Sequence, residues 1–441
     1  MIAGTNSGCG KTTVTCAVLQ ALVNRKINVS SFKCGPDYID PMFHKTVIGT
    51  AAYNLDTYLM SNDAVNYLLN KNSGDIAVIE GVMGFYDGFS FTEKGSTHEL
   101  SEITDTDVIL VVNCRGMSLS AMALVKGFKE FRKNNIKGVI FNNLSEKLYG
   151  DLSEECRKIG LVPLGFLPNI KDVQISSRHL GLVTAGEIDG IKDKMNLLAD
   201  YAEKYIDIDK ILEISENDRD TKFTSLEITK KYNVKIAVAY DRAFCFYYEE
   251  NKRALRQQGL ELVEFSPMED KKLPEGICGL YLGGGYPELH AGKLSENSGM
   301  RHAIFEAVRH GMPTIAECGG FLYLGRSLEG ADGIVYPMAG VLPGQGFRVG
   351  RLVRFGYAKL TARTDSMLFA AGECLPVHEF HHWDTTANGE AFAAAKADGR
   401  QWACGFANEH LYAGFPHLYW AGTPLPKRFA DAAGRYIKER T

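Results

Sequence analysis

The feature that most constrains this chain of 441 residues is a glycine-rich loop placed almost at its start. Residues 1–3 are apolar, the loop GTNSGCGKTT follows at residues 4–13, and an amphipathic helical pattern begins at once. Glycines let backbone N–H groups turn inward around phosphate oxygens, and the N-terminus of the next helix adds the positive end of its dipole. This order of strand, loop and helix predicts an α/β domain that binds a phosphorylated ligand.

The second half of the loop supplies the residues that we expect to bind ATP. Gly8 and Gly10 would shape the backbone around the phosphates, and Thr13 would also contact the nucleotide. Lys11 would reach the outer phosphates, and the Thr12 hydroxyl would complete the coordination shell of a Mg²⁺ ion. The usual motif has a glycine at its first position, where this chain has a threonine. Because GKT between a strand and a helix is a specific signal, ATP and Mg²⁺ remain the expected ligands.

Two further segments are expected to complete the ATP site. SFKCGPDYIDP at residues 31–41 ends one predicted strand and contains Lys33 and Asp37, whereas the strand IAVI ends in Glu80. The carboxyl ends of parallel strands meet at one edge of a sheet, where ligands bind. We therefore expect Lys33 to contact the nucleotide, and Asp37 and Glu80 to hold Mg²⁺ together with Thr12. A solvated turn is the alternative for residues 31–41.

Strands and helices alternate along the first 190 residues, which predicts a mostly parallel sheet covered by helices. Asn142, at the end of the last of these strands, is a candidate for the adenine edge, and a turn cap is the alternative. The predicted strands are 28–32, 76–80, 108–113 and 137–142, and the predicted helices include 12–24 and 118–133.

The rest of the chain predicts a second domain of the same class. Residues 191–232 are charged and helical in period and then polar, so we interpret them as a helix followed by a linker. A second series of strands and helices starts at residue 235. The prediction is a two-domain α/β protein, with a nucleotide-binding domain at 1–190 and a further α/β domain at 233–441.

A second candidate site surrounds Cys318. PTIAECGGFLYL at residues 313–324 runs from an apolar strand through Cys-Gly-Gly into a helical pattern, a sharp turn that presents a nucleophile. The N-terminus of that helix is expected to lower the pKa of the thiol. Backbone N–H groups near Gly319, and near Gly284 in the upstream loop YLGGGYPE, are expected to form an oxyanion hole. A buried structural thiol is the alternative reading of the cysteine.

A cysteine nucleophile needs a base, and histidines gather in two places. His378, His381 and His382 lie in PVHEFHHW, and His417 lies in YAGFPHLYW. The pattern alone does not choose between these two groups. The same histidines could hold a metal, but no cysteine or carboxylate spacing supports a zinc site.

Composition excludes several classes of protein. The net charge is −4, so the chain lacks the basic character of most nucleic-acid-binding proteins. No apolar run reaches the roughly 18 residues that span a bilayer, and no leader pattern precedes the loop. The 10 cysteines are scattered without a CxxC pair, which favours reduced thiols. We therefore expect a cytoplasmic protein without nucleic-acid or membrane partners.

Together these motifs resemble the cobyrinate a,c-diamide synthases, the glutamine-dependent amidotransferases of cobalamin biosynthesis, over essentially the whole chain. The resemblance implies an N-terminal ATP domain like that of dethiobiotin synthetase and a C-terminal class I glutamine amidotransferase domain. It also implies that ATP and Mg²⁺ activate carboxylates of cobyrinate and that L-glutamine supplies ammonia. The matching stretches are GTNSGCGKTT, FKCGPDYIDP, EGVMGFYDG, RHLGLV, LGGGYPELHA, AECGGFLYL, MAGVLPG and HEFHH.

The resemblance also implies roles for individual residues. The catalytic histidine of that family lies in the late motif, which implies His417, and HEFHH would then face the tetrapyrrole or the domain interface. Typical class I glutaminases have a glutamate two residues after this histidine, where this chain has Tyr419. A Cys-His dyad is therefore the expectation.

Residues of three matching motifs are candidates for binding the substrate: Asp40, Asp87, Arg178 and His179. An arginine suits a carboxylate because it can bind both oxygens, and a surface cation in a loop is the alternative. Close relatives of the family amidate hydrogenobyrinate or nickel-sirohydrochlorin instead of cobyrinate. A regulatory P-loop ATPase with an inactive amidotransferase domain is an alternative of a different class, and the intact cysteine motif argues against it. The sequence predicts no oligomeric state.

Overall fold

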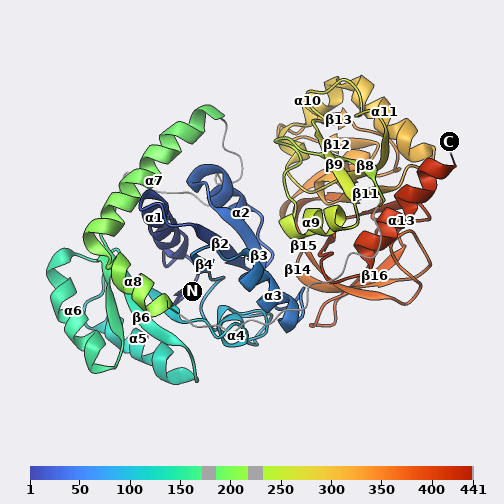
Figure 1. The fold of residues 1–441 in the computed structure, drawn as a ribbon. Coiled ribbons are helices and arrows are strands. Elements are labelled where there is room, and N and C mark those ends of the chain that lie inside the picture. Colours follow the sequence, from blue (N-terminus) through green and yellow to red (C-terminus); the bar gives the residue numbers. More distant parts are fainter. Residues whose placement is uncertain (171–184, 217–231, 440–441) are drawn as a thin grey trace. The chain divides into compact units, whose positions relative to one another are not determined.

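The computed structural model describes residues 1–170, 185–216 and 232–439. The chain divides into two compact units, Met1–Thr224 and Ser225–Thr441 (Figure 1). Each unit encloses a hydrophobic core of its own. The division falls inside the segment 191–232, whose helical part belongs to the N-terminal unit.

The N-terminal unit is built on a seven-stranded sheet with the strand order β3-β2-β4-β1-β5-β6-β7, and all its neighbouring pairs are parallel. The short strand β1 lies in the middle, so the loop that follows it emerges at the centre of the carboxyl edge. The strands are β1 (Ile2–Gly4), β2 (Val29–Cys34), β3 (Ala51–Leu55), β4 (Ile76–Glu80), β5 (Val108–Asn113), β6 (Ile136–Asn142) and β7 (Val162–Leu167).

Helices cover this sheet, and α1 (Lys11–Asn24) is packed most deeply. It lies between the sheet and α7 (Ala185–Tyr205), so its side chains from Val14 to Leu22 are buried on all sides (Figure 1). The expectation of an amphipathic helix is therefore wrong for residues 14–22, where Thr15 and Gln20 are the polar side chains of a stretch buried on every face. The other helical segments are α2 (Ile39–Phe43), the π-helix His44–Ile48, α3 (Asn62–Asn72), α4 (Thr97–Ile103), α5 (Ser120–Phe131), α6 (Glu146–Lys158) and α8 (Ile208–Ser215).

The C-terminal unit has a six-stranded sheet with the order β18-β19-β11-β10-β8-β9, parallel except for the β18–β19 pair. The strands are β8 (Val234–Ala239), β9 (Leu260–Phe265), β10 (Ile277–Leu282), β11 (Thr314–Glu317), β18 (Phe406–Ala407) and β19 (Leu411–Gly414). The helices are α9 (Glu249–Gln257), a 3₁₀ turn Pro287–Leu289, α10 (Ala291–Glu296), α11 (Ser298–Arg309), α12 (Gly319–Leu324) and α13 (Leu425–Lys438).

A second, mainly antiparallel sheet belongs to the same unit. Its long central hairpin pairs β14 (Gln345–Ala362) with β15 (Cys374–Thr385), and β15 pairs in turn with β20 (His417–Leu418). The remaining strands are β12 (Ser327–Glu329), β13 (Val335–Pro337), β16 (Phe392–Ala395) and β17 (Gln401–Cys404). The predicted two-domain α/β fold is confirmed, and this antiparallel sheet is an addition that the sequence did not predict.

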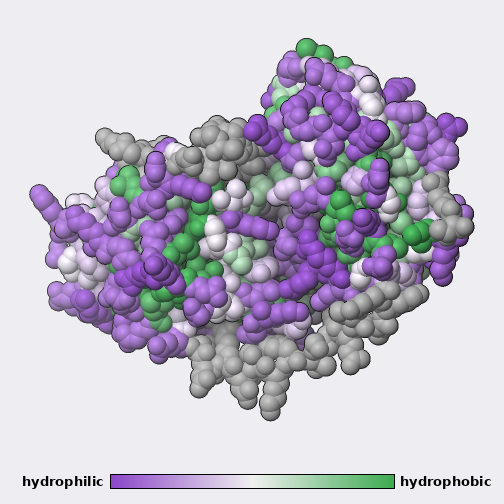
Figure 2. Space-filling view, turned by 45° about the horizontal axis from the view of Figure 1, so that its top comes forward, coloured by the Kyte–Doolittle hydropathy of each residue, from purple (hydrophilic) through white to green (hydrophobic). Residues whose placement is uncertain are grey.

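On the face that Figure 2 shows, hydrophilic side chains cover most of both units, and apolar side chains form smaller groups. None of the helices in the described ranges is long and apolar enough to cross a membrane.

Candidate active sites

The glycine loop after β1 has the backbone that a phosphate-binding loop requires. Gly8 and Gly10 have φ angles of 79° and 97°, in the left-handed region that side chains rarely adopt. The Asn142 side chain at the end of β6 donates a hydrogen bond to the Cys9 carbonyl oxygen at 2.9 Å. A Cβ on Gly10 would lie 1.9 Å from the Asn142 amide nitrogen. Asn142 therefore supports the loop, and its contact with adenine stays a prediction.

Lys11 bends back over the same loop. Its ammonium group donates hydrogen bonds to the carbonyl oxygens of Asn6, at 3.2 Å, and of Met83. Burial lowers the pKa of Lys11, while nearby acidic groups, Glu80 among them, oppose that shift. The ammonium group thus lies within the loop that is expected to hold phosphate.

A chain of ion pairs links the ends of β2 and β4. Lys33 and Glu80 are direct neighbours in the parallel register, which brings Lys33 Nζ to 2.9 Å from Glu80 Oε1. The Thr12 hydroxyl donates to the same oxygen at 2.6 Å, and Lys33 also pairs with Asp40 at 2.6 Å. The structure therefore brings together Thr12, Lys33, Asp40 and Glu80, as expected for strand ends that share one edge.

The electrostatics of this cluster leave negative charge incompletely compensated. Burial, together with neighbouring acidic groups, raises the pKa of Glu80 to about 7 and that of Asp37 to about 6. Burial also acts on Asp40, but the adjacent Lys33 outweighs it and lowers the pKa of that carboxyl. A cation brought to this cluster would stabilise the ionised carboxylates.

The donor set fits Mg²⁺ rather than a softer metal. Thr12 and Glu80 offer hydroxyl and carboxylate oxygens, which Mg²⁺ prefers, and Mg²⁺ takes its remaining ligands from phosphates and water. Across residues 1–170, 185–216 and 232–439, no group of three or more His, Cys, Asp or Glu side chains could hold a metal. Asp37 Oδ1 accepts hydrogen bonds from the backbone of Ile39 and Asp40, so at least this oxygen serves the start of α2.

Sequence analysis missed the histidine behind Glu80. His44 Nδ1 lies 2.6 Å from Ser31 Oγ, and its Nε2 lies 3.6 Å from Glu80 Oε2. The side chain is completely buried, and burial lowers its pKa to about 4, so the ring is neutral at pH 7. Its position depends on the π-helix that begins at His44, and no pattern in the sequence signals such an element.

The candidate substrate residues are less well defined. Asp87 is exposed, and its Oδ2 accepts the backbone N–H of Gly84 at 2.9 Å, which closes the turn after β4. Arg178 and His179 lie outside the described residues. Contacts of these residues with substrate, and of Asp40, stay predictions.

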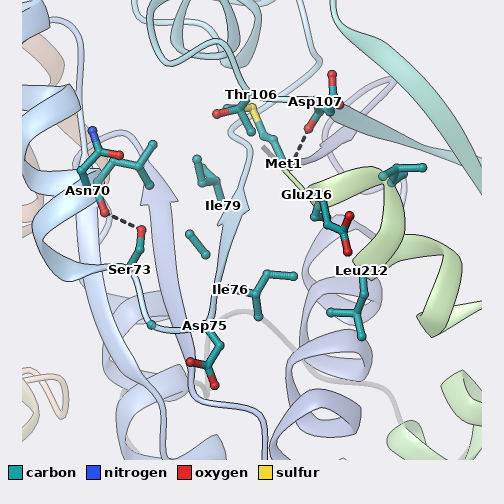
Figure 3. A pocket seen from close by; sticks show the side chains of 15 residues that line it. Met1, Asn70, Ser73, Asp75, Ile76, Ile79, Thr106, Asp107, Leu212 and Glu216 are labelled. Atoms are coloured by element: carbon teal, nitrogen blue, oxygen red, sulfur yellow. Dashed lines mark hydrogen bonds between the residues drawn. The ribbon is translucent and has the colours of Figure 1, made fainter. Parts of the chain in front are cut away.

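A separate cavity of about 470 Å³ opens at the opposite, amino-terminal edge of the same sheet (Figure 3). Met1 before β1, Ile76 of β4 and Asp107 before β5 line it, as do Leu212 and Glu216 at the end of α8. Because Gly4 and Glu80 end the same strands at the other edge, this cavity is not part of the phosphate site.

In the C-terminal unit, Cys318 occupies a strained turn between β11 and α12. Its φ and ψ are 49° and −100°, a conformation that costs on the order of 1–3 kcal/mol and recurs at functional sites. A Cβ on Gly320 would lie 2.1 Å from the Leu282 carbonyl oxygen, so only glycine fits there. The strand, sharp turn and helix predicted around Cys318 are confirmed.

The thiol is not activated at rest. Burial, and then the carboxylates of Glu288 and Glu379, raise the pKa of Cys318, whereas the backbone N–H of Gly319 lowers it. The expectation that the helix N-terminus would lower the thiol pKa is therefore wrong for the net effect. The N–H of Gly319 does act on the sulfur, but burial and negative charge outweigh it.

His417 lies in the short strand β20, and its side chain is buried. A Cβ on Gly284 would lie 2.6 Å from His417 Cε1, and one on Gly319 would lie 3.1 Å from the nitrogen of Gly285. The glycine loop after β10 therefore contacts both His417 and the Cys318 turn. Burial, with His378 and His381 nearby, lowers the pKa of His417 to about 3, so the imidazole is neutral and able to accept a proton.

The HEFHH segment, residues 378–382, lies within β15. His378 is directly opposite His417 in the β15–β20 pair, and His381 stacks on Phe415 with ring centroids 3.8 Å apart. Both histidines are buried, and a role of HEFHH toward the tetrapyrrole or a domain interface stays a prediction. His382, in contrast, is exposed.

Two buried residues that sequence analysis missed fix the strand that carries His417. Glu317 Oε1 accepts the backbone N–H of Leu418 at 3.1 Å, and the Asn251 side chain donates to the Leu418 carbonyl oxygen at 2.8 Å. Tyr419 packs edge-on against Tyr248 with ring centroids 5.4 Å apart. A glutamate at the end of an apolar strand was the available signal for Glu317.

The fold and these two sites define a class: a P-loop nucleotide-binding domain joined to an amidotransferase domain with a cysteine in a sharp turn and a buried histidine. Comparisons agree. The family described as CobQ/CobB/MinD/ParA nucleotide binding domain matches residues 1–183, and the CobB/CobQ-like glutamine amidotransferase domain matches residues 235–424.

Relatives match along the whole chain. The cobyrinate a,c-diamide synthase of Thermoplasma volcanium is 41% identical over 449 residues, covering 100% of this chain and 98% of the relative. The proteins of the same name from Caldanaerobacter subterraneus subsp. tengcongensis and Clostridium acetobutylicum are each 38% identical, over 99% and 96% of this chain and 98% and 97% of the relatives. The chain belongs to the cobyrinate a,c-diamide synthase family, as predicted. It is an enzyme, an amide ligase with glutamine as the nitrogen donor.

Proposed function

We propose that this enzyme converts cobyrinate to cobyrinate a,c-diamide, using ATP to activate each carboxylate and glutamine to supply each nitrogen. One observation carries the proposal. A nucleotide-binding unit and an amidotransferase unit lie in one chain that aligns end to end with relatives named cobyrinate a,c-diamide synthase.

The N-terminal unit would activate the carboxylate. A carboxylate is a poor acyl donor to ammonia, so a phosphoryl group must first pass from ATP to its oxygen, which gives an acyl phosphate and ADP. Lys11 and Lys33 are the cations positioned to spread the charge of the transferring group. Mg²⁺ held by Thr12 and Glu80, with Asp37 nearby, would supply further neutralisation of phosphate charge.

The C-terminal unit would release ammonia. Cys318 attacks the amide carbon of glutamine, and backbone N–H groups near Gly284 and Gly319 stabilise the oxyanion. His417, neutral at rest, takes the thiol proton and gives it to the leaving nitrogen as the C–N bond breaks. Water then hydrolyses the thioester, glutamate leaves, and the ammonia replaces phosphate on the activated carboxylate.

The experiment that tests this proposal compares tetrapyrroles. Purified protein is incubated with ATP, Mg²⁺ and glutamine, together with cobyrinate, hydrogenobyrinate or nickel-sirohydrochlorin in separate reactions. Mass spectrometry of the products is expected to show two amidations of cobyrinate, at a higher kcat/KM than either other tetrapyrrole supports. A preference for one of the other two would keep the chemistry and overturn the substrate.

A further inference from the structure

Two acidic side chains beside Cys318 have no part in the mechanism above. The first, Glu288, belongs to the 3₁₀ turn Pro287–Leu289 that follows the glycine loop. Its neighbour Pro287 contacts the nucleophile turn, since a Cβ on Gly319 would lie 2.9 Å from Pro287 Cδ. Among the residues that the structure describes, no Lys, Arg or His pairs with the Glu288 carboxylate. Burial raises its pKa to about 7, a sign of a carboxylate without a compensating cation.

The second, Glu379, approaches the nucleophile from the antiparallel sheet. The adjacent Phe380 carbonyl oxygen lies 3.9 Å from Cys318 Sγ. Glu379 is completely buried, and its Oε2 is bound by His381 at 3.1 Å and by Arg354 at 3.3 Å. Its other oxygen, Oε1, has no hydrogen-bond partner within the described ranges. A buried carboxylate oxygen left without a donor costs free energy, and such an atom at a nucleophile points to a donor on the ligand.

The side-chain charges that act most on the thiol are negative. They belong to Glu288, Glu379 and Glu317. Arg354 compensates Glu379 only in part, because it also binds Asp384 through two hydrogen bonds. A ligand that brings positive charge into this space would relieve both the unpaired oxygen and the repulsion.

From this arrangement we infer that Glu288 and Glu379 bind the α-ammonium group of glutamine. The ammonium group offers three N–H donors, which suit the unpaired oxygen of Glu379 and the Glu288 carboxylate, which has no cationic partner within the described residues. The inference rests on the proposed function, because it takes glutamine as the substrate of Cys318.

The pair also couples substrate binding to the nucleophile. Without glutamine, burial and the two carboxylates hold the thiol protonated, which protects it from alkylation and oxidation. When the ammonium group binds, it neutralises them, so the pKa of Cys318 falls and the proton can pass to His417. The amidotransferase unit would therefore become reactive only once an amino acid amide is bound.

The test compares two amides in two variants. Hydrolysis of L-glutamine and of glutaramate, the same amide without the α-amino group, is measured for the wild-type protein, Glu288→Gln and Glu379→Gln. The wild type is expected to prefer glutamine, and each variant to lose about ten- to a hundredfold of that preference, mainly through KM for glutamine. Glu275→Gln, at an exposed glutamate of the same unit, serves as the matched control and should keep the wild-type ratio.

Three results would separate the explanations. An equal loss for both amides would mean that the glutamates only support the fold, and equal use of both amides by the wild type would mean that no ammonium site exists. Either result overturns the inference. A wild-type protein that releases no glutamate from glutamine would instead refute the proposed function.

Alkylation of Cys318 by iodoacetamide gives a second readout that does not need turnover. Glu288→Gln removes negative charge next to the thiol, so alkylation at a fixed pH is expected to become severalfold faster even as glutamine use becomes slower. An unchanged or slower rate would place Glu288 too far from the sulfur and would overturn the inference. Glu379→Gln breaks a buried cluster with Arg354, so this variant could fail to fold. In that case the Glu288→Gln variant alone tests the inference.

Discussion

Burial at single residues sets the chemistry of both sites. In the N-terminal unit it raises the pKa of Glu80 to about 7, and in the C-terminal unit it raises the pKa of Glu317 to about 8. It acts in the opposite direction on His417, whose pKa falls to about 3. Each group is therefore held in or near its neutral form. A charged ligand or neighbouring group can then change its protonation state.

Glu317 gives a prediction about stability and pH. Its pKa is 4.5 in an unfolded chain and about 8 in the fold, so between these values the unfolded state has lost a proton that the folded state keeps. Stability from this residue is therefore fully present below about pH 4.5 and falls as the pH rises to about 8. Glu317→Gln keeps one acceptor oxygen for the Leu418 N–H, its amide nitrogen can donate to the Tyr281 hydroxyl oxygen, and it cannot ionise. The melting temperature of Glu317→Gln minus that of the wild type should therefore increase as the pH is raised from about 4.5 to about 8.

Thermal melts of both proteins at several pH values measure this difference. A difference that stays constant from about pH 5 to pH 8 would contradict the raised pKa of Glu317.

Residues were predictable from the sequence where a motif places them at a strand end. Lys33 and Glu80 follow adjacent parallel strands, and their pairing follows from that register. His44 and Glu379 were not predictable, because each depends on partners far away in the sequence. His44 contacts Glu80 from a π-helix, and Glu379 meets Arg354 across a hairpin whose register shifts between Val353 and Gly356.

Among the elements, the turn between β11 and α12 carries the most stringent geometry. Its glycines let the helix begin against the carboxyl end of β10, where the backbone N–H of Gly320 donates to the Gly283 carbonyl oxygen at 2.9 Å. The sequence predicted this turn because strand, Cys-Gly-Gly and helix are contiguous. It could not predict the β14–β15 hairpin, because most residues of β14 are half-buried or exposed and the strand lacks a regular alternation of buried and exposed positions.

Gly320→Ala tests the turn. A methyl group there would lie 2.1 Å from the Leu282 carbonyl oxygen. Because this oxygen belongs to the backbone of β10, the clash can be relieved only by a shift of α12 or of the strand. We expect a loss of roughly 1–3 kcal/mol in unfolding free energy, together with a large loss of glutamine hydrolysis. Denaturant unfolding and glutamate release measure the two effects.

The matched control is Gly299→Ala in α11, where the nearest atom would lie 3.5 Å away. A methyl group in that helix is expected to leave stability unchanged or to raise it by up to about 1 kcal/mol. If Gly320→Ala behaved like this control, the close packing of the turn against β10 would be refuted.

In the molecule as a whole, two units with separate cores are expected to carry two separable reactions. The sequence was sufficient to predict both units because each contains a site motif that is contiguous in the sequence. It did not predict that α7 and α8 pack with the N-terminal unit. A charged amphipathic segment does not show by its sequence which surface its apolar face covers, and here that surface includes α1.

Cys318→Ala tests whether the reactions are separable. The variant should use no glutamine, because no other residue replaces the nucleophile, but it should still amidate the tetrapyrrole when ammonium is supplied at high concentration. Product formation is measured with each nitrogen source in turn. Loss of activity with both sources would give Cys318 a structural role and contradict this account.

The central claim, that one chain transfers glutamine nitrogen to both carboxylates of cobyrinate, has one direct measurement. The protein is incubated with cobyrinate, ATP, Mg²⁺ and glutamine labelled with ¹⁵N in its amide group, and the product is analysed by mass spectrometry. The account predicts a product with two amides that both carry the label, with one glutamate released for each. A product without the label, or glutamine hydrolysis without any amidation of cobyrinate, would contradict it.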